Sequence, residues 1–235
     1  MSAPPPTPAI VAERYEALRS RIAGAGGRGV TVIAVTKAFG PWAIDAAAAC
    51  GIADIGENYA QECVAKLVEA SAAPMPRVHF VGRLQRNKVR MLAGCVDVWQ
   101  TVDRVELARE IGRRAPGAEV MIQVNISGEE TKAGCAPGDT ESLASAAGDA
   151  GLRLVGLMGI GPLGPPEEAR NGFRRLRRLV DSLGLPHCSM GMTDDLEVAV
   201  AEGATMVRVG RSLFGVRPRH ESRGVSQYGA PPGDR

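Results

Sequence analysis

The stretch EVMIQVNISGEETKAGCAPGDTESLASAAGDAGLRLVGLM, residues 119–158, carries the pattern that decides the fold. Residues 119–125, EVMIQVN, are the clearest strand in the sequence. Residues 139–150 predict a helix, and residues 152–158 predict a second buried strand. A strand, a helix and a further strand in succession predict a β-α-β unit whose strands are parallel.

The same alternation continues on both sides of this stretch without a break in composition. The predicted strands are residues 30–35, 53–55, 77–81, 96–99, 119–125, 152–158, 187–190 and 205–209. The predicted helices are residues 11–22, 41–50, 60–70, 87–93, 104–114, 139–150, 167–183 and 194–202. Such units form either an open doubly wound sheet or a closed barrel. Eight strands in 235 residues favour an α/β fold with a single (β/α)8 barrel of the TIM type, preceded by an N-terminal helix.

The two ends of the chain differ from the rest in composition. Residues 1–10 are rich in Pro, and we expect them to be disordered. Residues 11–215 make up the barrel domain. Residues 216–235 are polar and rich in Pro and Gly, which predicts a flexible C-terminal tail.

Composition excludes several classes of function. The 28 Lys and Arg against 26 Asp and Glu give a formal charge of +2, so we expect no nucleic-acid or anionic membrane partner. No run of eighteen apolar residues and no basic leader occurs, which predicts neither a spanning helix nor a signal peptide. Five scattered cysteines without a C-x-x-C pair predict reduced thiols and a cytoplasmic location. His79 and His187 have no acidic or Cys partner at ligand spacing, so we predict no metal site.

Polar residues gather at the carboxyl ends of the predicted strands, where both candidate folds place their sites. Lys37 follows an apolar strand and lies between Val35 and Phe39. Such a lysine is often a residue whose stem packs on apolar surface while its ammonium reaches water. Alternatively, a partly neutral amine at this position can form a Schiff base with an aldehyde.

A second cluster follows the last two predicted strands. Residues 189–193 offer two hydroxyls and a glycine, and residues 210–212 offer a further glycine and a serine. Backbone amides and hydroxyls that converge at helix starts suit a phosphate dianion. Alternatively, the glycines serve tight turns and the hydroxyls cap helices. This explains each of the two segments separately but not their occurrence together. Because a closed barrel pairs its first and last strands, Arg208 is expected beside Lys37.

Five motifs together resemble a known family. They are A-V-T-K at 34–37, G-E-N-Y-x-Q-E at 56–62, H-F-V-G-x-L-Q-x-N-K at 79–88, S-M-G-M-T-x-D-x-E-x-A at 189–199 and V-R-V-G-x-x-L-F-G at 207–215. In this order they resemble the pyridoxal phosphate homeostasis protein family, single-domain relatives of the alanine racemase barrel. Thr193 stands where the family pattern has Ser and keeps the hydroxyl.

The resemblance implies a barrel that binds pyridoxal 5'-phosphate (PLP) as an aldimine on Lys37. The implied phosphate contacts are Ser189, Gly191, Thr193 and Gly210. Met190, between Ser189 and Gly191, is also implied as a cofactor-binding residue. Arg208 would face the pyridine nitrogen, and Asn58 would line the ring pocket. A guanidinium is only a donor and leaves that nitrogen unprotonated, which weakens the cofactor as an electron sink.

The function implied is PLP homeostasis, by storage, delivery or control of free PLP, without a catalytic residue. Apoenzymes that need PLP are the expected recipients, and we expect a monomer. One alternative is a PLP-dependent amino-acid racemase, which needs an acid or base on each face of the substrate. Another is a barrel that binds a phosphorylated metabolite without covalent chemistry.

Four arginines, 170, 174, 177 and 178, fall on one face of the predicted helix 167–183. Apolar residues occupy its opposite face. This pattern predicts a solvated outer face of the barrel rather than an anion-binding patch.

Overall fold

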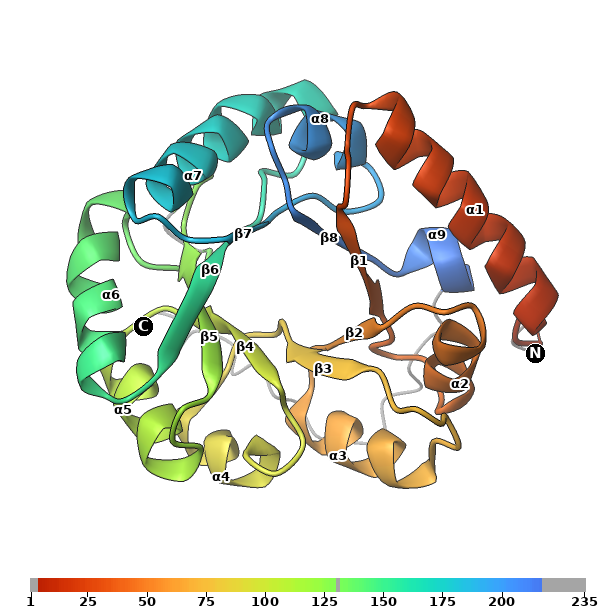
Figure 1. The fold of residues 1–235 in the computed structure, drawn as a ribbon, viewed down its shortest axis with the longest axis horizontal. Coiled ribbons are helices and arrows are strands. Elements are labelled where there is room, and N and C mark those ends of the chain that lie inside the picture. The colour runs from red at the N-terminus through yellow and green to blue at the C-terminus, as the bar shows by residue number, and fades with distance from the viewer. Residues whose placement is uncertain (1–3, 130–131, 217–235) are drawn as a thin grey trace, which may run out of the picture.

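The predicted strands form a closed barrel in which all strands are parallel (Figure 1). The computed structural model describes residues 4–129 and 132–216. The strands are β1 (Thr31–Val35), β2 (Asp54–Glu57), β3 (Arg77–Phe80), β4 (Val98–Val102), β5 (Glu119–Val124), β6 (Arg153–Gly159), β7 (His187–Ser189) and β8 (Met206–Val209). Each strand pairs with the next, and β8 closes the ring on β1. The predicted (β/α)8 barrel is confirmed.

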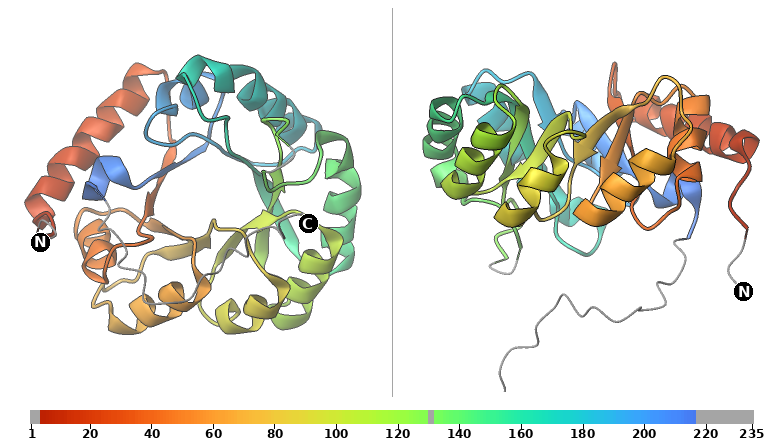
Figure 2. Two further views of the ribbon diagram at one scale, coloured as in Figure 1. Left: turned by 180° about the vertical axis from the view of Figure 1, so that it is seen from behind. Right: turned by 90° about the horizontal axis from the view of Figure 1, so that it is seen from below.

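Helices surround the ring of strands on the outside (Figure 2). They are α1 (Pro8–Gly24), α2 (Trp42–Ala49), α3 (Ala60–Glu69), α4 (Val89–Leu92), α5 (Val105–Arg114), α6 (Thr140–Asp149), α7 (Arg170–Ser182), α8 (Leu196–Ala201) and α9 (Arg211–Phe214). Short 3-10 turns, η1 (Arg86–Lys88), η2 (Pro137–Asp139) and η3 (Pro166–Ala169), precede α4, α6 and α7. The additional helix α1 packs against α2, α8 and α9 and so covers the seam between the first and last strands.

Helix α1 begins earlier than the sequence predicts. Pro is compatible with the first turn of a helix, and the Thr7 hydroxyl accepts a hydrogen bond from the Ile10 N–H at 3.4 Å. Residues 8–10, which we expected to be disordered, therefore belong to α1. Of the expected tail, residues 217–235 lie outside the described residues.

Strand β4 differs most from its predicted bounds of 96–99. The N–H groups of Cys95 and Val96 donate to the Leu92 carbonyl, so these residues still close the end of α4. The strand extends to Val102 because Gln100, although polar, has hydrogen-bond partners inside the barrel. Alternating hydrophobicity could not show this, since polar residues normally mark a strand's end.

The core has two layers. The larger layer lies between the strands and the helices, where one face of α7 contributes Phe173, Leu176 and Val180. A smaller apolar cluster in the barrel consists of Ile33, Val98, Met121, Val155, Met158 and Met206. The barrel is therefore filled by side chains, as in other (β/α)8 folds, and its carboxyl-terminal mouth is left for a site.

Within the described residues, no helix combines the length and the apolar character that crossing a membrane requires.

Candidate functional site

Lys37 lies at the carboxyl-terminal end of β1, two residues beyond its last residue, and is half-buried. Ala38, directly after it, has φ 61°, in the left-handed region that a residue with a side chain rarely adopts. Conformations of this kind persist where the surrounding contacts enforce them, and they concentrate at functional sites.

The contacts that enforce this turn come from α3 and the end of β2. The Lys66 ammonium is 2.7 Å from the Thr36 carbonyl oxygen, 2.5 Å from Glu57 Oε1 and 2.9 Å from Glu62 Oε1. The Thr36 hydroxyl donates to the same Glu57 oxygen. We call Glu57, Glu62 and Lys66 the α3 clamp.

The α3 clamp holds the backbone on both sides of Lys37. Lys66 donates to the carbonyl of Thr36, which precedes Lys37, and Glu62 accepts the N–H of Ala38, which follows it, at 2.6 Å. Both peptide groups that flank Lys37 are therefore fixed by charged groups, and charge-assisted hydrogen bonds of this type are the strong ones. The clamp pre-organises the direction in which the Lys37 side chain leaves the backbone.

Glu57 is completely buried, and burial raises the pKa of its carboxyl above the usual range, while the neighbouring Lys66 ammonium opposes that rise. Its second oxygen, Oε2, is buried without a hydrogen-bond partner among the residues described. Sequence reasoning did not single out the α3 clamp. The spacing of Glu62 and Lys66, four residues apart on a helix, was the signal that could have found it.

Arg208 lies in β8, where it is paired in register with Ile33 of β1, four residues before Lys37. It is almost completely buried, and burial lowers the pKa of its guanidinium to about 10, so the group is still a cation at neutral pH. Its two terminal nitrogens donate to the Ser189 hydroxyl and to the Gly159 carbonyl oxygen, each at 2.8 Å.

The loop after β7 is shaped by close backbone contacts. Gly191 has φ 92°, and a Cβ at this position would lie 2.5 Å from the Cβ of Ala199 in α8. The Gly191 carbonyl accepts a hydrogen bond from the Arg208 N–H, and the N–H of the buried Met190 donates to the Met206 carbonyl. Two consecutive residues of the loop, Met190 and Gly191, are therefore bonded to β8. Only glycine meets both demands at position 191.

At Thr193, the loop after β7 meets the start of α9, which is close in sequence to Gly210. The Ser212 hydroxyl donates to the Thr193 hydroxyl at 3.1 Å, and Gly210 directly precedes α9. The Thr193 carbonyl is in turn held by the Arg21 guanidinium of α1 at 3.1 Å. The junction presents two hydroxyls beside the start of α9, where the N–H groups of Leu213 and Phe214 donate to the Gly210 carbonyl.

Asn58 follows β2 at the same end of the barrel and is half-buried. Its Oδ1 is buried without a hydrogen-bond partner in the part of the chain that the structure covers. A Cβ on Gly82 would lie 2.1 Å from the Asn58 carbonyl oxygen, so the ends of β2 and β3 are packed as closely as backbones allow.

The structure thus brings the predicted residues to one end of the barrel. Their hydroxyls differ in where their hydrogen-bond partners lie. Ser189 is buried in the barrel, and its hydroxyl donates to Gln100 Oε1 at 2.7 Å while it accepts from Arg208. Thr193, by contrast, is bonded to Ser212 in α9. The described residues contain no group of three or more His, Cys, Asp or Glu that could hold a metal ion.

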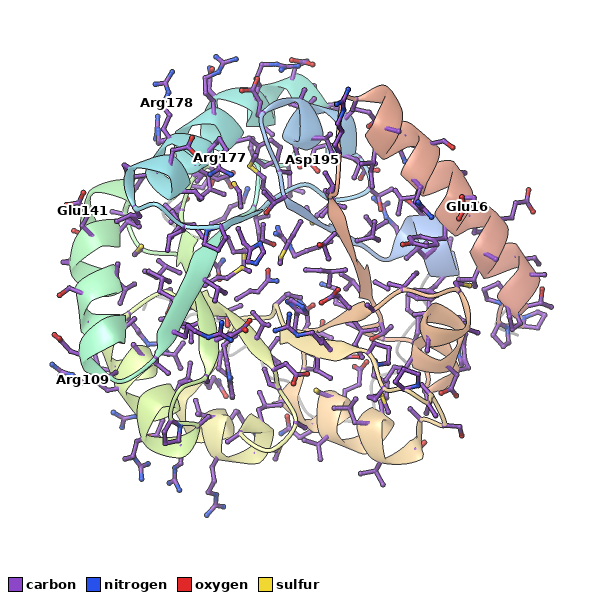
Figure 3. All side chains as sticks on the ribbon, in the orientation of Figure 1. Glu16, Arg109, Glu141, Arg177, Arg178 and Asp195 are labelled. Atoms are coloured by element: carbon purple, nitrogen blue, oxygen red, sulfur yellow. The ribbon has the colours of Figure 1, made fainter. Side chains whose placement is uncertain are left out.

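The arginine-rich face of α7 lies outside this site. Arg170 and Arg174 both pair with Glu202, and Arg177 pairs with Asp181. Figure 3 shows Arg178 pointing away from the barrel.

Comparison with known proteins defines the class and then the family. Residues 9–218 match the family model described as alanine racemase, N-terminal domain, so the barrel is of the alanine racemase type. Two relatives named pyridoxal phosphate homeostasis protein are each 41% identical to the chain. The one from Pseudomonas aeruginosa is aligned over 94% of this chain and 98% of its own length, and the one from Aquifex aeolicus over 88% and 95%. The chain belongs to the pyridoxal phosphate homeostasis protein family.

A solved structure agrees with this assignment. PipY of Synechococcus elongatus, solved with PLP bound, is 33% identical and superimposes with a TM-score of 0.77 over 87% of this chain and 100% of its own.

Proposed function

We propose that the mouth of the barrel binds PLP and that Lys37 holds it covalently, so that the protein serves PLP homeostasis. The observation that carries the proposal is the α3 clamp, which fixes both peptide groups around a lysine at the carboxyl-terminal end of a barrel strand. Support also comes from the relatives, which are named for PLP homeostasis, and from PipY, which was solved with PLP. When bound, PLP supplies an aldehyde carbon, which condenses with a primary amine to form a carbon–nitrogen double bond and release one water.

The residues at the mouth fit such a group. Asn58 has a buried amide oxygen without a partner in the described chain, and rotation of the amide lets it offer either an acceptor or a donor to a ring substituent. Arg208 offers a buried cationic donor toward the ring nitrogen. A donor-only group at that nitrogen leaves it unprotonated, which suits a protein that holds PLP without turning over a substrate.

The phosphate is assigned to the junction of Thr193 and Gly210. Hydroxyls and backbone N–H groups at this junction form charge-assisted hydrogen bonds to a dianion. Gly191 shapes the loop that carries Thr193, and Met190 supports it from the buried side. The Ser189 hydroxyl is already bonded to Gln100 and Arg208, and we therefore assign it to Arg208 rather than to the phosphate.

The proposal includes the absence of amino-acid turnover. Lys37 can act on one face of a bound substrate, and racemisation needs a second positioned group on the other. Chiral chromatography of L-alanine incubated with the PLP-loaded protein tests this point. Rapid inversion that is abolished by Lys37→Ala would favour the racemase instead. The proposal also includes delivery to apoenzymes, a monomeric state and a cytoplasmic location. The five cysteines without a disulfide support the cytoplasmic location.

Absorbance titrations with PLP and with pyridoxal test the binding site. We expect a visible band with PLP. The Kd for pyridoxal should be at least roughly 100-fold higher, because pyridoxal has no phosphate dianion and so lacks several hydrogen bonds of about 1.5–3 kcal/mol each. Thr193→Val should narrow this difference, while the control Thr193→Ser, which keeps the hydroxyl, should preserve it. Equal affinities would overturn the phosphate assignment. Binding without a visible band would favour a barrel for phosphorylated metabolites.

A further inference from the structure

A continuous chain of hydrogen bonds crosses the interior of the barrel below the mouth. It runs from Arg208 in β8 to Ser189 in β7 (2.8 Å), to Gln100 in β4 (2.7 Å), to His79 in β3 (2.7 Å) and to Asp54 in β2 (2.8 Å). We call these five residues the interior relay. None of His79, Gln100 and Asp54 was expected at the site from the sequence.

The donor-only Arg208 and the acceptor-only Asp54 stand at the two ends of the relay and give its hydrogen bonds one direction. A guanidinium can only donate, so the Ser189 oxygen accepts from it, and the Ser189 hydroxyl donates to Gln100 Oε1. This fixes the amide of Gln100 with its nitrogen toward His79 Nδ1. The amide donates, so His79 Nδ1 carries the lone pair, the ring proton is on Nε2, and Asp54 accepts it.

The relay is buried over almost its whole length. His79, Gln100 and Ser189 are completely buried, Arg208 is 5% exposed, and only the Asp54 side chain, at 13%, reaches the surface. In such surroundings a polar group that loses its partner is costly, and the links of a network depend on one another. A change at Gln100 therefore alters the hydrogen bonding of Arg208 through Ser189.

We propose that Gln100 and His79 are positioning residues for Arg208, which they hold through Ser189 in the orientation that meets the ring nitrogen of PLP. The inference rests on the proposed function, because the ring nitrogen belongs to the cofactor. The carbonyl of Gly159 fixes the second guanidinium nitrogen, so the relay and β6 together hold the group at two points. Strands on the far side of the barrel thus determine the electrostatics at one end of the cofactor.

The test compares Gln100→Leu and Ser189→Ala with Thr101→Val. Thr101 is the next residue in β4 and equally buried, and its hydroxyl has no hydrogen-bond partner among the described residues, so its substitution controls for disturbance of the strand. The readouts are the Kd for PLP and the visible spectrum of the bound cofactor as a function of pH. We expect Gln100→Leu and Ser189→Ala to raise the Kd about tenfold and to shift the pH midpoint of the spectrum, and Thr101→Val to change neither.

A double-variant cycle separates positioning from simple loss of packing. If Gln100 acts through Arg208, Gln100→Leu should have little further effect in an Arg208→Lys background. Additive effects of the two substitutions on the Kd for PLP would overturn the proposal. So would a Gln100→Leu variant whose Kd and spectral pH midpoint are the same as those of Thr101→Val.

Nitrogen NMR of His79 in the unmodified protein without PLP provides a measurement that needs no variant. We expect a proton on Nε2, which faces Asp54, and a lone pair on Nδ1, which faces the Gln100 amide nitrogen; a proton on Nδ1 would overturn the relay. A wild-type protein that fails to bind PLP would refute the proposed function instead, so the two failures are distinguishable.

Discussion

The α3 clamp and the interior relay are both buried polar networks, but they lie on opposite sides of the barrel wall and are built differently. In the clamp, two carboxylates converge on one ammonium, and an oxygen of Glu57 has no partner among the described residues. In the relay, a cation and a carboxylate stand at the two ends of a line made of a hydroxyl, an amide and an imidazole. The clamp fixes a backbone, around Lys37, whereas the relay fixes a side chain, that of Arg208.

The difference suggests how each network responds to damage. Removing the one ammonium of the clamp leaves the buried Glu57 carboxyl beside the half-buried Glu62 carboxylate without a cation between them, which is a problem of charge. Removing one link of the relay leaves a hydroxyl, an amide or an imidazole unsatisfied, which costs less per group. Stability should therefore depend chiefly on the clamp, and the properties of the bound cofactor on the relay.

Lys66→Met is expected to have the largest effect on stability. Breaking a buried ion pair from one side typically costs about 3–5 kcal/mol of unfolding free energy. Urea denaturation measures this loss, and Lys88→Met, at a half-buried lysine in η1, provides the control, for which about 0.5 kcal/mol or less is expected. Equal losses in the two variants would contradict the role assigned to the clamp.

Glu57→Gln should have an intermediate effect that depends on pH. Burial raises the pKa of the Glu57 carboxyl in the folded state, so the folded protein binds a proton more readily than the unfolded one. The stability of the wild type relative to Glu57→Gln should therefore be greatest in acid and decline as pH rises through the raised pKa, by an amount on the order of 1 kcal/mol. Urea titrations at a series of pH values measure the slope. A relative stability that rises with pH would show that the Lys66 attraction outweighs burial.

Asp54→Asn should have the smallest effect. An Asn oxygen can still accept the His79 proton and so keep the direction of the relay, and we therefore expect a loss of about 1 kcal/mol or less and an unchanged Kd for PLP. Urea denaturation and PLP titration of this variant would show whether the charge of Asp54 matters. A loss as large as that of Lys66→Met would mean that the relay, like the clamp, depends on charge.

The sequence predicts the parts of this molecule that follow from periodic patterns. Alternating apolar strands and helices give the barrel, and closing the barrel pairs β8 with β1, which brings Arg208 beside the strand that leads to Lys37. The bounds of β4 could not be predicted, because Gln100 is acceptable inside the barrel only through partners from other strands.

Both polar networks were missed for the same physical reason. Lys66 reaches Thr36 across thirty residues, and Ser189 reaches Gln100 across eighty-nine. Apart from the four-residue spacing of Glu62 and Lys66, contacts of this kind leave no local pattern, and they become visible only when the strands are assembled. The short helix α9 was likewise not predicted, since four residues are too few for a periodic signal.

The central claim is that Lys37 is the covalent anchor of PLP, and borohydride reduction of the PLP-loaded protein tests it most directly. Reduction converts the carbon–nitrogen double bond to a stable secondary amine, and peptide mapping by mass spectrometry then locates the pyridoxyl group. The α3 clamp predicts the label on the peptide that contains Lys37, and loss of both label and visible absorbance in Lys37→Ala. A label on Lys88 or Lys132, or a visible band that persists in Lys37→Ala, would contradict the claim.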